Sequence, residues 1–380
     1  MGKSQKGQKK PVGLTVIIKP THDCNLGCKY CYVESEAESG RMDEATLRNS
    51  VRKVSKFVGK DKETHFIWHG GEPLLMGKEF YEMVVEAERE MGEGYTITNS
   101  IQSNGTLLTP EMADFFKEYE FHIGLSLDGP AEIHDRTRPY KDGRKSFRNV
   151  LRAVKLARSR KIGGGVIAIL NRVSIGHLEE LYDFFKENQI GLKFNPLIRS
   201  GRARENYDGL SITPKEYGEA MIRLFEMWFY DPAHKDGVKV MIDPFDAVIG
   251  NIITGRPQGC NYSESCRNNF ISIGPTGAVY PCGRFDGIPE FYMGNINDDK
   301  VGDMLASPIH VKLKERSAET VKGCSPCKYK KICNAGCMHN AYMVDGDAMG
   351  KDYYCAGYKK LFGHIEKTLH KELKKAEVKA

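Results

Sequence analysis

The segment LTVIIKPTHDCNLGCKYC, residues 14–31, joins an apolar run to three closely spaced cysteines. The β-branched residues of the run 14–19 predict a buried strand. Cys24, Cys28 and Cys31 follow it with the spacing C-x3-C-x2-C. Functional residues of α/β folds lie at the C-terminal ends of parallel strands, so this segment predicts a strand that carries a site at its end.

Outward from this segment, short apolar runs alternate with amphipathic helical patterns up to about residue 200. Apolar residues at Leu47, Val51, Val54 and Val58, for example, recur with helical spacing. Repeated β-then-α units predict an α/β fold with a parallel sheet covered by helices. We expect six strands, at residues 14–19, 65–69, 95–102, 122–127, 165–170 and 192–197.

Polar turns follow the second, third and fourth predicted strands, as the cysteine segment follows the first. They are Gly70-Gly71-Glu72-Pro73, Ser103-Asn104-Gly105 and Asp128-Gly129-Pro130. Since parallel strands end on one side of a sheet, we expect these turns to meet around the cysteines.

Composition excludes several classes of protein. The 380 residues carry a formal net charge of +6, with 11 cysteines and no long apolar run. We therefore expect no membrane span and no nucleic-acid partner. Residues 1–12 are basic without an apolar core, which predicts a solvated tail rather than a signal peptide. Without an export signal, so many cysteines indicate metal or catalysis before disulfides, and we expect a cytoplasmic protein.

Three thiolates on one loop are one ligand short of a closed zinc site or a complete 4Fe–4S cluster. A cluster with three protein ligands leaves one iron free for a small molecule. The alternatives are zinc with a distant fourth ligand, or free loop thiols.

At Cys24, Cys28 and Cys31 the sequence resembles the radical S-adenosylmethionine superfamily, whose signature is this loop after the first strand of a partial (β/α)6 barrel. The resemblance implies that the three cysteines hold a 4Fe–4S cluster and that its open iron binds S-adenosylmethionine. It implies hydrogen abstraction by a 5'-deoxyadenosyl radical, in an oxygen-poor environment. It also places Tyr30 near the adenine.

The segment Gly70-Gly71-Glu72-Pro73 is similar to the GGEP motif of that superfamily. Two glycines let the backbone approach a ligand, and Glu72 can accept hydrogen bonds from the methionine ammonium group. By the same resemblance, four further residues bind the ribose and the carboxylate, with turn capping or a surface charge as the alternative for each. They are Asn104, Ser126, Asp128 and Arg138.

The other eight cysteines lie between Cys260 and Cys355 and are similar to a SPASM extension. The resemblance implies two closed auxiliary 4Fe–4S clusters that transfer electrons. The first would take Cys260, Cys266, Cys282 and Cys337, and the second Cys324, Cys327, Cys333 and Cys355. Zinc is the alternative, since C-x2-C is also a zinc motif. The implied domains are the barrel at 13–212, a helical bridge at 213–259, the SPASM domain at 260–357 and a C-terminal helix and tail at 358–380.

Nearly the whole chain resembles anaerobic sulfatase-maturating enzymes, but two positions differ. Gly283 stands where those enzymes have an aspartate proposed as the catalytic base, which leaves Asp286 as the nearest acid. His69 precedes GGEP in place of the usual glutamine, as in maturases of ribosomally made peptides; it is a candidate substrate contact or proton acceptor, or forms a structural hydrogen bond.

These differences favour a radical oxidoreductase that crosslinks or dehydrogenates a ribosomally made peptide. The second hypothesis is formylglycine formation on a sulfatase Ser or Cys, and the third is a zinc-binding interaction protein. Either enzyme needs a peptide or protein substrate and an electron donor such as flavodoxin or ferredoxin.

Overall fold

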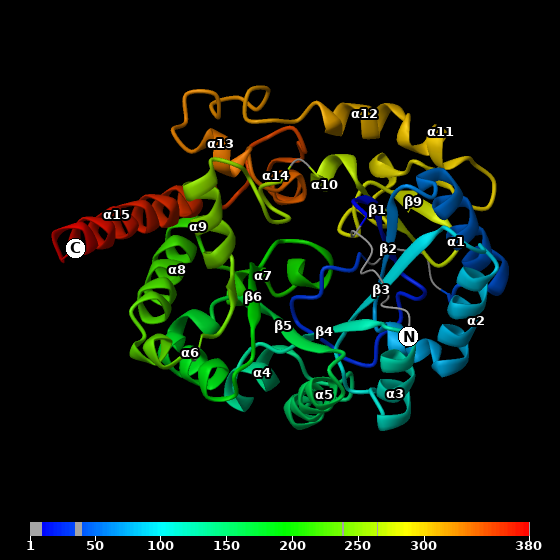
Figure 1. The fold of residues 1–380 in the computed structure, drawn as a ribbon, viewed down its shortest axis with the longest axis horizontal. Helices are drawn as coiled ribbons and strands as arrows, with labels where there is room; N and C mark the ends of the chain where they lie inside the picture. The colour runs from blue at the N-terminus through cyan, green and yellow to red at the C-terminus, as the bar shows by residue number, and fades with distance from the viewer. Residues whose placement is uncertain (1–9, 35–39, 238, 264, 380) are drawn as a thin grey trace, which may run out of the picture.

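One mixed sheet organises the chain. The computed structural model describes residues 10–34, 40–237, 239–263 and 265–379, so residues 1–9 of the predicted tail lie outside the described residues. The ten strands seen there pair in the order β10-β9-β8-β1-β2-β3-β4-β5-β6-β7. Figure 1 shows the strands at the centre with helices around the outside, which is the arrangement of a partial (β/α)6 barrel.

The predicted six-strand pattern is confirmed. Strands β1 to β6 are each parallel to the next. Their ends differ from the predicted ends by no more than two residues, because a strand stops where its pairing stops rather than where its apolar run stops. The strands are β1 Val12–Ile18, β2 Glu63–Trp68, β3 Thr96–Ser103, β4 His122–Ser126, β5 Gly163–Leu170 and β6 Leu192–Pro196.

Side chains cap several helices. Asp43 accepts a hydrogen bond from the Thr46 backbone at the start of α1, and Thr213 and Glu216 form a capping box on α8. The helices of the barrel and the bridge are α1 Glu44–Val58, α2 Lys78–Arg89, α3 Pro110–Glu118, α4 Ala131–Thr137, α5 Phe147–Arg160, α6 Leu178–Glu187, α7 Tyr207–Leu210, α8 Pro214–Phe229 and α9 Phe245–Thr254.

The cysteine-rich region adds strands directly to the barrel. Strand β8 (Phe270–Ile273) pairs parallel with β1, and β9 (Ala278–Tyr280) and β10 (Gly294–Asn295) continue the sheet antiparallel. At the other edge, β7 (Ile242–Asp243) pairs with β6. The sheet therefore crosses the boundary expected at residue 260, and the cysteine-rich region is anchored to the strand that precedes the cysteine loop.

The remaining helices lie on the cysteine-rich side of the molecule (Figure 1). The last one begins at Cys355, three residues before the predicted start, and packs along α8. Within the described residues, no helix is both long and apolar enough to span a membrane. These helices are α10 Ser265–Asn268, α11 Val301–Leu305, α12 Pro308–Lys314, α13 Lys330–Cys333, α14 Met338–Asp345 and α15 Cys355–Lys379.

Candidate functional site

The first three cysteines follow β1 on one loop, as the sequence predicts. The Cys24 thiol accepts a hydrogen bond from the Leu26 backbone at 3.4 Å. Burial raises the pKa of Cys24 to about 11 and that of Cys28 to about 12. Both thiols therefore stay protonated at neutral pH unless a cation replaces the protons. Buried thiols of this kind suit a metal centre, since metal binding displaces their protons.

The two glycines of GGEP pack against the cysteine loop. A Cβ on Gly70 would lie 2.3 Å from the Thr21 carbonyl oxygen, and one on Gly71 would lie 2.1 Å from the Asp23 carbonyl oxygen. The sequence predicts that these glycines let the backbone approach a ligand. In the structure they let two loops of the protein approach each other, so that the ends of β1 and β2 form one unit.

Glu72 joins this unit to the end of β3. Its Oε1 accepts hydrogen bonds from the Ser103 hydroxyl at 2.7 Å and the Leu74 backbone at 3.0 Å, and its Oε2 accepts one from the Asn104 backbone at 2.7 Å. Burial raises the pKa of this carboxyl, although these hydrogen bonds act to lower it. About four acceptor positions exist on a carboxylate, so one remains for the predicted ammonium contact.

Asn104 and Ser126 lie at the ends of the next two strands. The Asn104 amide donates to Asn25 Oδ1 at 2.8 Å and lies 3.7 Å from the Cys24 sulfur. The half-buried Ser126 hydroxyl accepts a hydrogen bond from the Gln102 amide at 3.3 Å. Asn104 thus braces the cysteine loop, while Ser126 keeps hydrogen-bonding capacity toward a ligand.

Tyr30, Asp128 and Arg138 form one buried network. The Tyr30 hydroxyl donates to Asp128 and accepts a hydrogen bond from Arg138 Nη1 at 2.8 Å. Asp128 also accepts from the Thr137 hydroxyl at 2.9 Å and from the Ile169 backbone at 3.2 Å. Both Asp128 oxygens thus accept hydrogen bonds from other parts of the protein.

Arg138 keeps one donor free. Its side chain is 10% exposed, and its Nε has no hydrogen-bond partner among the described residues. The guanidinium is close enough to lower the pKa of Cys24 and Cys28, against burial and neighbouring thiols. An unused cationic donor beside the cysteine loop fits the carboxylate of S-adenosylmethionine.

The structure gathers four later cysteines on the barrel side of the cysteine-rich region. A hydrogen bond from Cys266, together with Lys193 and Arg284, lowers the pKa of Cys260 below its ordinary value. Arg284 Nη1 lies 3.8 Å from the sulfur of Cys337. The charges of Cys260, Cys282 and Cys337 all act on Cys266, so these four thiols are neighbours, as the first auxiliary set requires.

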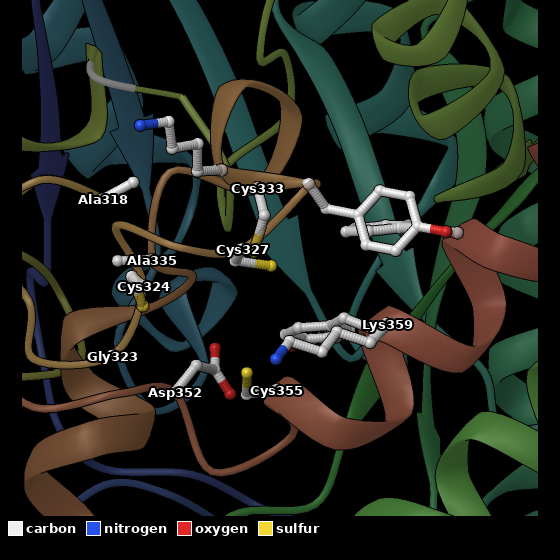
Figure 2. Close-up of a pocket in the computed structure, with 13 residues that line it drawn as sticks. Ala318, Gly323, Cys324, Cys327, Cys333, Ala335, Asp352, Cys355 and Lys359 are labelled. Atoms are coloured by element: carbon white, nitrogen blue, oxygen red, sulfur yellow. The ribbon is translucent and has the colours of Figure 1, made fainter.

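The other four cysteines line a separate cavity. Figure 2 shows the sulfurs of Cys324, Cys327, Cys333 and Cys355 around it, beside Asp352. The water-accessible volume of this cavity is about 20 Å³. Among the described residues, no three His, Cys, Asp or Glu side chains are placed to hold a single metal ion. Thiols that surround a cavity suit a cluster of several atoms.

A buried cation lies between the two auxiliary sets. Arg316 is 0% exposed, and its guanidinium donates to the carbonyl oxygens of Gly336 at 2.7 Å and of Ala335 and Gly350 at 2.9 Å. It forms no ion pair with a described carboxylate, and its Nε has no partner among the described residues. A buried charge needs counter-charges. The buried carboxylate of Asp352 acts on Arg316, and anionic clusters ligated by thiolates would add to its effect.

His69 and Asp286 have defined partners. His69 Nδ1 accepts a hydrogen bond from the Gly70 backbone at 2.8 Å, while burial and Lys19 lower the pKa of the ring to about 4. The neutral ring therefore carries its proton on Nε2, where it is a donor. Asp286 is buried and lies 3.3 Å from Lys19 Nζ and 3.5 Å from His22 Nε2. Burial acts to raise the pKa of Asp286, but these partners outweigh it and lower the pKa.

Lys19 is a further residue at this site, and no motif in the sequence predicts it. This lysine is 1% exposed, its amine also lies 5.3 Å from the ring of Tyr32, and it faces the cysteine-rich region through Asp286. The one feature of the sequence that could have indicated a role for Lys19 is its position as the last residue of the first apolar run. Arg316 carries no such signal, because its burial depends on contacts with segments further along the chain.

Two family models match the chain. Residues 18–185 match the radical SAM superfamily, and residues 260–328 match SPASM, an iron-sulfur cluster-binding domain.

Curated relatives match almost end to end. A cysteine-type anaerobic sulfatase-maturating enzyme of Clostridium perfringens is 30% identical, over 92% of this chain and 95% of its own. A serine-type anaerobic sulfatase-maturating enzyme of Bacteroides thetaiotaomicron is also 30% identical, over 93% of this chain and 89% of its own.

Among solved structures, native anSMEcpe with bound AdoMet superposes with a TM-score of 0.83 at 29% identity, covering 94% of this chain and 98% of that one. The chain therefore belongs to the radical S-adenosylmethionine superfamily and, within it, to the SPASM-domain family of the anaerobic sulfatase-maturating enzymes, whose cofactors are S-adenosylmethionine and 4Fe–4S clusters.

Proposed function

We propose that this enzyme oxidises a Cys or Ser side chain of a sulfatase peptide to formylglycine. The observation that carries the proposal is 30% identity to both cysteine-type and serine-type sulfatase maturases over nearly the full length of each chain. A structure of native anSMEcpe with AdoMet and a Cp18Cys peptide also superposes with a TM-score of 0.82 at 29% identity. These relatives favour the second hypothesis of the sequence analysis over oxidation of a ribosomally made peptide.

Bound S-adenosylmethionine and the cluster of the cysteine loop supply the radical that removes a hydrogen atom from the substrate side chain. The protein's own residues hold these groups in place. Cys24, Cys28 and Cys31 would ligate the cluster, and the guanidinium of Arg138 would bind the carboxylate of S-adenosylmethionine. Tyr30 orients that guanidinium through the 2.8 Å hydrogen bond. Because Glu72 and the two glycines tie the surrounding loops together, the site is held in shape before ligands bind.

Asp286 is the proposed proton acceptor in place of the missing aspartate at position 283. The turn from Cys282 to Phe285, closed by a 2.9 Å backbone hydrogen bond, brings Asp286 to the end of β1 beside Lys19. Its lowered pKa keeps the carboxylate ionised at neutral pH, as a base requires. His69, with its proton on Nε2, is the proposed donor that orients the substrate backbone.

The auxiliary clusters are the proposed acceptors of the electron that oxidation leaves on the substrate. The first set includes Cys282, four residues before Asp286, so the base and the first acceptor lie on the same turn.

The decisive experiment uses reconstituted enzyme, S-adenosylmethionine and a reductant under anaerobic conditions. Two sulfatase-motif peptides that differ only in Cys or Ser are incubated in parallel, and mass spectrometry with a hydrazide label detects an aldehyde. We expect an aldehyde on at least one peptide. Formation of 5'-deoxyadenosine without an aldehyde on either peptide would contradict the proposal.

Oxidation of a ribosomally made peptide is the second candidate, and Gly283 is the observation that favours it. A Cβ at this position would lie 3.1 Å from Ile17 Cγ2, so a side chain there would crowd β1. This chain thus has no carboxylate at position 283, and a side chain there would require Ile17 to shift by a few tenths of an ångström. A crosslink or a dehydrogenation in a precursor peptide, with sulfatase peptides left unchanged, would establish this candidate.

A further inference from the structure

The second auxiliary set of cysteines lies directly beneath the surface. Cys324 and Cys327 belong to a loop whose residues Gly323, Ser325 and Pro326 are all exposed. Cys355 is the first residue of α15, at the edge of the same cavity. A protein that docks on this loop would come close to the proposed cluster without any movement of the fold.

Exposed lysines surround this opening. Lys322, Lys351 and Lys359, which we call the lysine rim, are all exposed. A Cβ on Gly323 would lie 2.6 Å from Lys351 Nζ, which places that amine over the loop. Figure 2 shows Lys359 at the cavity with its amine directed toward Cys355. The rim therefore gives the opening a positive charge.

The rim lysines differ from their neighbours in having no acidic partner. Lys328 pairs with Glu366 and Lys330 with Glu319, each at 2.8 Å. No ion pair joins a rim lysine to a carboxylate in the part of the chain that the structure describes. The buried Arg316 already supplies positive charge behind the cavity. Neutralising the cluster therefore does not by itself account for the exposed lysines of the rim.

We propose that the loop at residues 322–328 and the lysine rim form the docking face for an acidic one-electron carrier protein of the flavodoxin class, which exchanges electrons through the second auxiliary cluster. Charge complementarity selects the carrier and accelerates the encounter. When the oxidised carrier docks, the cluster loses the electron taken from the substrate and the carrier gains it, with no bond made and no proton transferred. A reduced carrier docked on the same face transfers one electron in the reverse direction. The proposal depends on the cofactor content of the family and not on the proposed substrate, so the peptide assay and the docking assay can fail separately.

The test uses holoenzyme and a recombinant bacterial flavodoxin as the probe. Chemically reduced flavodoxin is mixed with oxidised holoenzyme in an anaerobic stopped-flow instrument, and the cluster absorbance reports its reduction. The docking variant carries Lys322→Glu and Lys351→Glu and leaves Lys359, which lies at the cavity, unchanged. The matched control carries Lys56→Glu and Lys155→Glu on α1 and α5, which reverses the same number of exposed charges far from the cavity (Figure 1).

We expect the docking variant to be reduced by flavodoxin at least 10-fold more slowly at low salt, and the control variant to match the unmodified enzyme. Dithionite, which is small and needs no docking face, should reduce all three proteins alike and shows that their clusters are intact. For the unmodified enzyme, the flavodoxin rate should fall steeply as salt screens the charges.

Two results would overturn the proposal. One is a docking variant with full iron content that flavodoxin reduces as fast as it reduces the control variant. The other, which needs no variant, is a flavodoxin rate in the unmodified enzyme that does not change with salt.

Discussion

Asp286 shows how a single residue depends on distant parts of the chain. It follows Cys282 by four residues, yet its partners Lys19 and His22 come from the loop at the end of β1. A buried carboxylate and a buried ammonium group stabilise each other only as a pair, and removal of one leaves an unpaired charge that costs about 3–5 kcal/mol. The residue therefore contributes to stability as well as to the proposed chemistry.

Replacement of Asp286 should separate radical formation from product formation. We expect Asp286→Asn to form 5'-deoxyadenosine but to lower oxidised peptide by about 10²-fold or more, because the proton acceptor is lost. Chromatography of both products measures this ratio, and Asp286→Glu is the control that keeps the charge. Equal losses of 5'-deoxyadenosine and peptide product would show a structural role alone.

The same carboxylate predicts a pH dependence. Because the folded-state pKa of Asp286 is lowered, its ion pair stabilises the fold above the ordinary aspartate pKa of about 3.9 and is lost as pH falls through the lower folded pKa. Urea unfolding should therefore show that the difference in stability between the native enzyme and Asp286→Asn shrinks on acidification. A difference that is constant from neutral pH to about pH 3 would contradict the pairing.

Replacement of Arg316 should affect the holoenzyme more strongly than the iron-free protein. In holoenzyme, Arg316→Met should lower the reduction potential of the second auxiliary cluster and weaken its retention, because a nearby positive charge is lost. In iron-free protein the same change should cost less stability, since the clusters then no longer add negative charge beside the buried cation, although Asp352 still does. Redox titration followed by electron paramagnetic resonance measures the potential, and Arg316→Lys should restore part of it.

At the scale of the elements, the contact between GGEP and the cysteine loop is the tightest feature near the first site. A Cβ on Gly71 would lie 2.1 Å and 2.3 Å from the carbonyl oxygens of Asp23 and His22, both of which are backbone atoms. Gly71→Ala must therefore displace the loop that carries Cys24. We expect this variant to lose the iron of one cluster and to stop forming 5'-deoxyadenosine.

Gly176→Ala is the matched control for this prediction, since a Cβ on Gly176 would meet nothing within 4 Å. Its iron content and activity should equal those of the unmodified enzyme. Full iron content in Gly71→Ala would show that the two loops can separate without loss of the cluster site.

At the scale of the whole molecule, the cysteine-rich region has two kinds of support. Strand β8 is hydrogen-bonded to β1, and Ile271 and Ile273 on β8 belong to the barrel core. The segment with Cys324, Cys327 and Cys333 has short helices and a small apolar cluster of its own, and it reaches the main core through Tyr329 and Ile332. Its stability should therefore come mainly from metal.

Removal of iron should thus loosen one part of the molecule and spare the other. We expect chelation to increase hydrogen exchange strongly at residues 315–355 and little in β1 to β6, because the barrel core forms without clusters. Mass-spectrometric hydrogen exchange of the holoenzyme and the iron-free enzyme compares the two parts. A uniform increase over the whole chain would mean that the clusters also hold the barrel together.

The amino-acid sequence by itself determined the elements and the partition of the cysteines. Alternation of apolar runs with helical spacing is local, so six strands, their order and the caps at Thr109 and Thr213 could be predicted. Cysteine spacing and family resemblance predicted three sets, and the structure groups the later eight cysteines accordingly.

Only the tertiary structure decided how the elements meet. The pairing of β8 with β1, the Lys19 partner of Asp286 and the burial of Arg316 join residues far apart in sequence. Charge pairing and burial depend on the distance between groups in space, and no local pattern records that distance. For the same reason the sequence assigned Glu72 and the GGEP glycines to a ligand, while the fold also uses them to fasten three loops together.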